Sequence, residues 1–259
     1  NLGFTGEYGI TGGAGVEFDN FRGKGQKLNI GASTGTNFSI YTTQEPSKYR
    51  SLNISFQDPM INDSPYLVGA SIFYSFRGSS TNYYFPLDFT VGGAVASFGR
   101  RLEWPDDFFR VMWSAKFMQK EYEGSQSDID NYIGGLQKTR GISLSQVLSR
   151  DSRNRAEFPT NGSTFILENT YSGGFLGGKE NFQRHMLTLD WFTPTFSKFI
   201  LYNSVKLGVI KTLDVGDDIQ SFVPFDERFI MGGNGIPYGN ALRGYPDNAI
   251  GPQTVSGQA

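Results

Sequence analysis

Residues with the chemistry for catalysis are few and scattered in this 259-residue chain. Gly31-Ala32-Ser33-Thr34-Gly35 fits the Gly-x-Ser-x-Gly pattern of serine hydrolases, in which the serine occupies a sharp turn between a strand and a helix. Here the pattern continues into Thr36-Asn37-Phe38-Ser39-Ile40, which is typical of more strand, and the one histidine, His185, is far along the chain. We therefore interpret the match as coincidental and predict no catalytic residue.

Metal and phosphate chemistry find equally little support. His185 has no second histidine and no cysteine to join it as a ligand. Asp128 and Asp130 could touch calcium, but the spacing and glycine of a calcium-binding loop are missing. Gly23-Lys24-Gly25 lacks the remainder of a phosphate-binding loop and is better interpreted as a tight turn. We expect no metal and no cofactor.

One arginine near the end of the chain has different surroundings. Gly232-Gly233-Asn234-Gly235 comes before Arg243, and Gly244 and Tyr245 follow it directly. Glycines allow a close backbone approach or a positive φ, and the guanidinium is a planar fork of donors that fits a carboxylate or stacks on an aromatic ring. From the residues alone, an exposed loop charge is the favoured interpretation of Arg243.

Composition limits the class of protein. Lys and Arg number 23 against 25 Asp and Glu, a net charge of −2, which does not favour binding to nucleic acid. The absence of Cys rules out a disulfide framework. No apolar run is long enough for a transmembrane helix, and the mean hydropathy is −0.35. Transmembrane β-strands alternate in polarity, so such an average is compatible with a membrane barrel.

Alternation with a period of two recurs along most of the chain and predicts about ten antiparallel strands. Their apolar sides are expected to share one face of the sheet, so that Val111, Trp113 and Phe117 face lipid while Arg110 and Lys116 face the other way. The strands are expected around Tyr8–Phe18, Leu28–Ser33, Leu52–Gln57, Val68–Phe76, Leu87–Val95, Phe109–Phe117, Ile142–Leu144, Phe165–Tyr171, Leu187–Trp191 and Phe199–Val209.

A soluble β-sandwich shows the same alternation, but three features favour a membrane barrel. The polar faces carry full charges, which suit a wet interior. Aromatic residues gather near the strand ends, as they do at membrane interfaces. The connections alternate between short turns and longer polar loops, the pattern of outer-membrane barrels. The full charges expected on the polar faces of the strands are those of Arg110, Lys116, Glu168, Asp190 and Lys206.

Five short segments, in order, resemble motifs of the outer-membrane β-barrel assembly factors, the BamA superfamily. The first is similar to the family's turn between strands two and three, and its key residues here are Asn20, Phe21, Gly23 and Gly25. The last two are similar to loop six, with Arg243, Gly244 and Tyr245 in the signature and Phe229, Gly232 and Gly233 before it. The segments are Phe18–Gly25, Asn53–Pro59, Phe158–Ser163, Phe229–Gly233 and Leu242–Pro252.

The resemblance implies an all-β fold: an antiparallel transmembrane β-barrel, present in part from a 16-stranded barrel. Residues 1–259 would form this partial barrel domain, and residues 213–259 would be a long extracellular loop six that folds into the lumen. The ten strands would correspond to strands two to eleven, with strand one and the last five outside the chain. A seven-residue insert at 235–241 lengthens the loop before the signature.

The function that the resemblance implies is not enzymatic. Family members fold and insert client β-barrel proteins through a lateral seam of the barrel, in the outer membrane of Gram-negative cells. The implied partners are the outer-membrane lipid bilayer, unfolded client barrels, accessory assembly lipoproteins and the protein's own upstream POTRA domains. Arg243, with Gly244 and Tyr245, would pin loop six against the inner wall.

Other functions remain open at this point. A two-partner secretion translocator or a TamA-like translocator of the same superfamily would share the barrel. A passive porin is the alternative from another class, and a porin would be expected to show a constriction loop with clustered charges. A soluble sandwich would be extracted without detergent.

Overall fold

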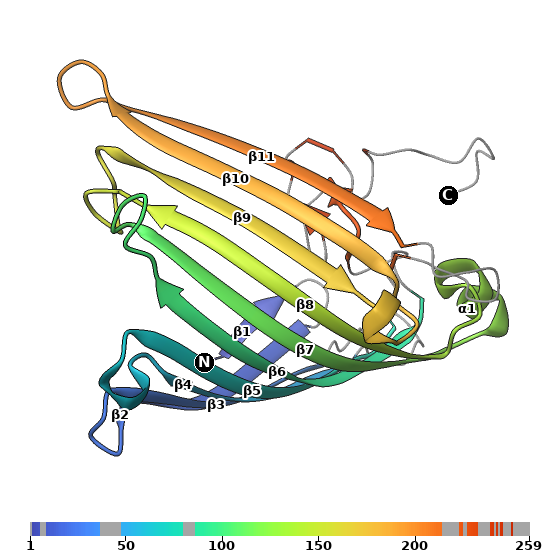
Figure 1. The fold of residues 1–259 in the computed structure, drawn as a ribbon. Coiled ribbons are helices and arrows are strands. Elements are labelled where there is room, and N and C mark those ends of the chain that lie inside the picture. The colour runs from blue at the N-terminus through green and yellow to red at the C-terminus, as the bar shows by residue number, and fades with distance from the viewer. Residues whose placement is uncertain are drawn as a thin grey trace.

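The structure, a computed structural model, describes residues 2–5, 9–36, 48–79, 86–213, 223–224, 227–232, 239–240, 242, 244–245 and 250. One antiparallel sheet of eleven strands dominates it, and each strand pairs with its neighbours in the sequence (Figure 1). The strands are β1 (Leu2–Thr5), β2 (Gly9–Phe21), β3 (Gln26–Thr36), β4 (Lys48–Asp58), β5 (Tyr66–Arg77), β6 (Asp88–Arg101), β7 (Phe109–Glu123), β8 (Lys138–Asp151), β9 (Gly162–Ser172), β10 (Phe182–Pro194) and β11 (Ile200–Thr212).

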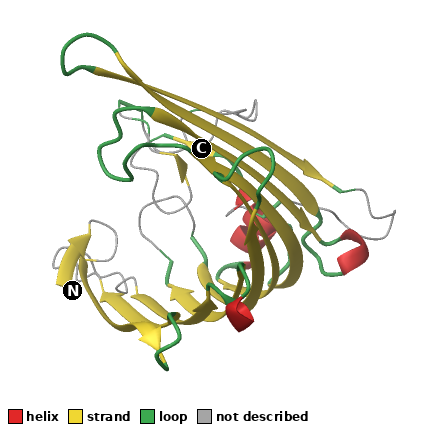
Figure 2. Cartoon of the chain, turned by 60° about the vertical axis from the view of Figure 1, so that its left-hand side comes forward, coloured by secondary structure: helices red, strands yellow, loops and turns green. Residues whose placement is uncertain are grey.

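The sheet curls into an open trough with β1 and β11 as its edge strands (Figure 2). The turns that begin at residues 22, 59, 102, 152 and 195 lie at one end, which we call the short-turn end (Figure 1). The loops after β5, β7 and β9 lie at the opposite, long-loop end. No helix in the described part of the chain has the length and apolarity to cross a membrane.

The two faces of the trough differ in chemistry. Arg110 on β7 is in register with Ser149, Ser149 with Ile166, Ile166 with Thr188, and Thr188 with Lys206, so these residues share one face. The opposite face carries exposed apolar side chains on strand after strand. Ile72, Phe117, Leu207 and Val209 are between 46% and 66% exposed there. Alternation in the sequence therefore becomes a polar concave face and an apolar convex face.

The long-loop end holds a small apolar core. Helix α1 (Gln126–Ile133) begins at Ser125, whose hydroxyl accepts the amide of Asp128, and ends at Gly134 in the left-handed region. Its apolar side packs Ile129 and Ile133 on the strand ends. The core comprises Leu87, Phe89, Tyr122, Ile129 and Ile133.

The structure corrects the sequence-based strand assignment in three places. The sheet has eleven strands and not ten, because Leu2–Thr5 forms β1 and pairs with Gly9–Gly12 of β2. Residues 126–133, which lie between two expected strands and for which no helix was predicted, form α1. The apolar side chains of the expected strand Leu87–Val95 were predicted to face lipid, and this is wrong. Val95 is in register with Lys116 on the concave face, whereas Phe98 is in register with Trp113 on the convex face.

Candidate functional site

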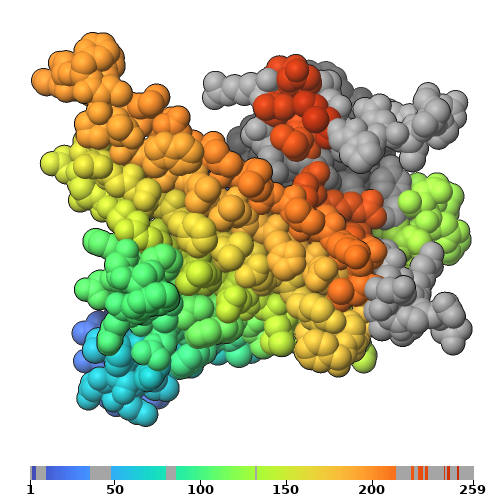
Figure 3. Space-filling model, turned by 45° about the horizontal axis from the view of Figure 1, so that its top comes forward, coloured from blue at the N-terminus to red at the C-terminus, as the bar shows by residue number. Residues whose placement is uncertain are grey.

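The C-terminal segment that follows β11 contacts the concave wall through an ion pair. Nη1 of Arg184, on β10, lies 2.7 Å from Oε2 of Glu227. The side chains are 25% and 16% exposed, so the pair is largely shielded from water. Arg184 shares its face with Thr170 and Ser145, which places it on the polar wall. Arg184 is the third residue of β10, so this contact fixes the segment near the long-loop end of the sheet. Figure 3 shows the packed side chains of β9 to β11, coloured yellow to orange, which form this part of the wall.

A second contact joins the segment to β11, where Gly208 leaves space for the ring of Phe229. A Cβ built on Gly208 would lie 2.6 Å from Cζ of Phe229, and two further ring atoms lie within 3.0 Å. The ring therefore occupies the space that any other residue at position 208 would fill. Phe229 is followed by β12 (Ile230–Met231), which pairs in parallel with β13 (Gly239–Asn240).

The predicted loop-six residues are described only in part. Gly232 is buried and has a φ of 129°, and Gly244 has a φ of 88°, so both adopt backbone that favours glycine. Tyr245 is 52% exposed. Arg243 and Gly233 lie outside the described residues, and the partner of Arg243 remains a prediction.

The predicted turn motif closes β2 onto β3 at the short-turn end. The side-chain oxygen of Asn20 accepts the amide of Gly25 at 2.7 Å, and its carbonyl accepts the amide of Gly23 at 3.1 Å. Gly23 and Gly25 have φ values of 72° and 67°. Arg22 lies over the Phe21 ring at 5.3 Å from its centroid. These residue types are therefore explained locally by the turn they form.

A buried ion pair, which the sequence analysis did not find, ties the loop after β9 to the concave wall. Nζ of Lys120 lies 3.1 Å from Oε1 of Glu180, and both side chains are 1% exposed. The Thr139 hydroxyl donates to the same oxygen at 3.0 Å. Gly178 forms a bridge to Gly141 of β8, which carries the loop across the sheet. Neither residue stands out in the sequence, because pairing across 60 positions leaves no local pattern.

The candidates for enzyme chemistry lie apart from one another. Ser33 is in the middle of β3 and shares a hydrogen bond of 2.6 Å with Ser51, so no sharp turn presents it. Nδ1 of His185 is 2.8 Å from Oδ1 of Asn169 on the convex face. Asp128 belongs to the cap of α1. Within the described ranges, no group of three or more His, Cys, Asp or Glu side chains could hold a metal ion.

The first edge of the sheet is unusually rich in glycine. Among its 13 residues, β2 includes Gly9, Gly12, Gly13 and Gly15. Glycine in a strand loses more conformational entropy on folding and offers no side chain for packing. The pairing of β1 with β2 is therefore expected to be weaker than pairing elsewhere in the sheet.

At the short-turn end, an arginine organises the turn between β6 and β7. Nε of Arg150 lies 2.8 Å from Oδ2 of Asp106, and its guanidinium lies over the Phe108 ring at 5.5 Å. Partial burial raises the pKa of Asp106, but the hydrogen bonds from Arg150 and from the Phe108 amide, with the charge of Arg150, outweigh it. The pKa of Asp106 therefore lies below its ordinary value of 3.8.

A curled antiparallel meander, polar inside and apolar outside, with a segment bound to its inner wall, defines a transmembrane β-barrel domain. Residues 20–259 match the Omp85 superfamily domain. This chain belongs to the Omp85 superfamily, and it is an outer-membrane β-barrel domain. The predicted fold class and location are thereby confirmed.

Two relatives illustrate the similarity. The chain is 26% identical, over 215 residues, to the outer membrane protein assembly factor BamA of Nitratidesulfovibrio vulgaris strain Hildenborough, covering 80% of this chain and 24% of that protein. It therefore spans about a quarter of the length of that relative. The crystal structure of BamA from Haemophilus ducreyi lacking POTRA domains 1–3 matches with a TM-score of 0.73 and 19% identity, covering 97% of this chain and 46% of that chain. This second likeness concerns the fold.

Proposed function

We propose that this domain is the membrane barrel of an outer-membrane protein assembly factor, which folds and inserts client β-barrel proteins. The observation that carries the proposal is the superfamily match over residues 20–259, together with a relative named as an assembly factor. The fold suits the task because the convex face offers apolar side chains to lipid while the trough is polar.

The β1 edge is the proposed place of client pairing. A client strand that adds to an edge gains main-chain hydrogen bonds, and it buries apolar side chains in the bilayer as it does so. The glycine-rich β2 behind β1 makes local opening there less costly than elsewhere. Pairing and burial supply the free energy, so the proposal requires neither a cofactor nor a catalytic residue. The family of assembly factors is not an enzyme family.

Residues 213–259 are proposed to be the extracellular loop six, which folds into the lumen. The Arg184–Glu227 ion pair and the Phe229 ring on Gly208 support this, since both join the segment to the concave wall. Arg243, with Gly244 and Tyr245, is proposed to hold the loop further along. Arg243→Ala should loosen the loop and lower the outer-membrane levels of client barrels. Normal client levels in a strain carrying only this variant would contradict the role.

The proposed partners are the lipid bilayer, unfolded client barrels, accessory assembly lipoproteins and POTRA domains upstream in the same protein. The test is depletion of the full-length protein in its own host, followed by quantitative proteomics of the outer membrane. We expect many unrelated barrels to decline together. Loss of one secreted protein with barrels intact would identify a dedicated translocator, and no change in either would identify a pore; both outcomes contradict the proposal.

A further inference from the structure

Two arginines face each other at the short-turn mouth of the trough. Arg101, the last residue of β6, is in direct register with Arg110 of β7. Both belong to the concave face, because Arg110 shares its row with Ser149 and Lys206. Like charges directly opposite on neighbouring strands destabilise a sheet. An anion bound at Arg110 would reduce this repulsion.

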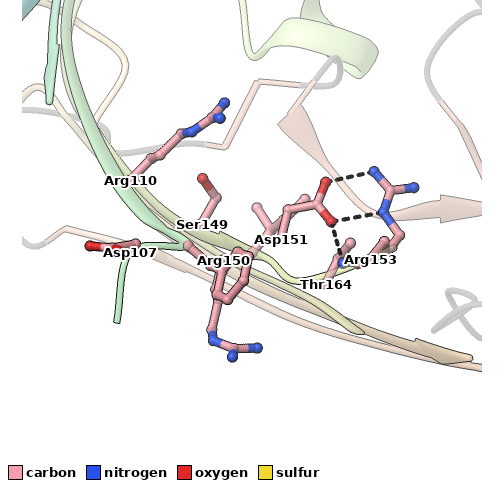
Figure 4. A pocket seen from close by; sticks show the side chains of 9 residues that line it. Asp107, Arg110, Ser149, Arg150, Asp151, Arg153 and Thr164 are labelled. Atoms are coloured by element: carbon pink, nitrogen blue, oxygen red, sulfur yellow. Dashed lines mark hydrogen bonds and ion pairs between the residues drawn. The ribbon is translucent and has the colours of Figure 1, made fainter. Parts of the chain in front are cut away.

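Two nearby carboxylates form their hydrogen bonds with other arginines, while the charge of Asp151 also acts on Arg110. Asp151 accepts hydrogen bonds from Nε and Nη2 of Arg153 at 2.9 Å and 2.7 Å, and Asp106 is bound by Arg150. Among the described residues, Arg110 forms no hydrogen bond or ion pair, and its side chain is exposed. Asp107 accepts from Nε of Arg101 through its backbone carbonyl at 2.6 Å, and its carboxylate points away from Arg110 (Figure 4).

A cavity lies beside Arg110. Its volume is about 260 Å³, and Phe108, Ser149, Thr164 and Ile166 are among its lining residues. Two acidic residues, Asp107 and Asp151, also line it, and Asp151 is held by Arg153. Arg110 and Arg150 leave the sheet on opposite sides (Figure 4). Arg150 thus belongs to the lipid-facing side, whereas Arg110 extends over the polar interior. The cavity therefore offers the Arg110 guanidinium, the Ser149 hydroxyl and two apolar walls, whereas the Thr164 hydroxyl already donates to Asp190 at 3.0 Å.

We propose that this cavity binds an acidic residue of an extended polypeptide, with Arg110 taking the carboxylate and Arg101 adding a second positive charge. A guanidinium binds a carboxylate through two parallel hydrogen bonds, and Phe108 and Ile166 fit a neighbouring apolar side chain. The position favours a chain that enters the trough from the short-turn end. A lipid phosphate does not fit, because Arg110 is on the face turned away from the bilayer.

The peptide is taken to be part of a client, so this assignment rests on the proposed function, but its test measures binding alone. The full-length protein in detergent micelles is titrated with a fluorescent peptide of alternating Asp and Phe, and with its matched Asn and Phe counterpart. Fluorescence anisotropy gives both dissociation constants. The variants are Arg110→Gln, Arg101→Gln and, as control, Lys116→Gln, which removes a concave-face cation of the same strand away from the cavity.

We expect the Asp peptide to bind about tenfold more tightly than the Asn peptide. Arg110→Gln should abolish this preference, Arg101→Gln should reduce it, and Lys116→Gln should leave it intact. The thermal unfolding temperature of Arg110→Gln should be unchanged or higher, because repulsion is relieved, which separates lost binding from lost folding.

Three results would overturn the assignment. The preference could survive in Arg110→Gln, or disappear equally in Lys116→Gln, which would indicate general attraction by the polar wall. Inorganic phosphate could displace the labelled peptide as effectively as unlabelled Asp peptide does, which would identify a site for any oxyanion. None of these results depends on whether depletion of the protein lowers the levels of other barrels, so this assignment and the proposed function can fail separately.

Discussion

Arg184 on β10 and Glu227 in the C-terminal segment form an ion pair of 2.7 Å across 43 positions of sequence. Since neither side chain is more than 25% exposed, removing one charge leaves the other poorly solvated. Arg184→Gln or Glu227→Gln should each speed proteolysis of the segment after β11. The double variant should show a coupling energy of about 1–3 kcal/mol.

The control for this pair is Arg228→Gln, which removes the exposed charge next to Glu227. Arg228 contacts the carbonyl of Val223 and no acid in the described part of the chain. Its proteolysis rate should stay near that of the unaltered protein. Equal rates for the Arg184 and Arg228 variants would show that the ion pair does not hold the segment.

The space that Gly208 leaves for Phe229 leads to a second prediction for the same segment. In Gly208→Ala, the new methyl group would overlap the Phe229 ring, so the ring must leave the wall. We expect faster proteolysis of the segment, and partial recovery in the double variant Gly208→Ala with Phe229→Leu. Gly92→Ala is the control, because a Cβ there meets its nearest atoms at 3.8 Å. Failure of the smaller side chain to restore protection would contradict a steric cause.

The buried pair of Lys120 and Glu180 should matter for folding more than for the segment. Removing one partner leaves a charge that is 1% exposed, so Lys120→Met or Glu180→Gln should cost about 3–5 kcal/mol of unfolding free energy. The matched control is the neighbouring pair of Lys138 and Glu121, which is 67% and 32% exposed. Lys138→Met should cost about 0–1 kcal/mol in the same urea titration. Similar losses of unfolding free energy for the two pairs would contradict the expected difference between a buried and an exposed ion pair.

The strand order was predictable because each strand carries its own alternation and pairs with its sequence neighbour. The prediction of which face of β6 meets lipid was wrong for a physical reason. Its convex side is lined by Ala94 and Ala96 until Phe98, while Val91 and Val95 face the polar interior, so apolar character alone chose the wrong side. The short β1 offers only four residues of pattern.

The candidate site was predictable only where residues act locally. Asn20, Gly23 and Gly25 define a turn within six positions, so their types reveal it. The contacts of Glu227, Phe229 and Glu180 join positions far apart, and they depend on how the sheet curls. Only the three-dimensional arrangement shows which polar residues of the wall they meet.

The corrected face of β6 can be tested directly. Ala94→Lys places a charge on the convex face beside Phe117 and should cost about 2–4 kcal/mol if it lies near the bilayer midplane. Val95→Lys places it on the concave face next to Lys116 and Ser71, where water accompanies it, so folding into liposomes should be nearly normal. Phe117→Lys is the reference for a lipid-facing position. The reverse order of the two β6 variants would restore the original assignment of its faces.

The turn between β6 and β7 should respond to acid through Asp106. Its pKa is lowered in the folded protein, mainly because the contacts with Arg150 and the Phe108 amide outweigh the opposing effect of burial. A lowered folded pKa means that the stabilisation is complete above the ordinary value of 3.8 and is lost as the pH falls through the lowered value. Unfolding free energy measured from pH 6 downward should therefore decline below about pH 4. In Asp106→Asn this part of the decline should be missing, while Asp107→Asn, which leaves the Arg150 contact intact, should retain it. Identical acid profiles for Asp106→Asn and the unaltered protein would show that the contact with Arg150 contributes nothing to the stability of this turn.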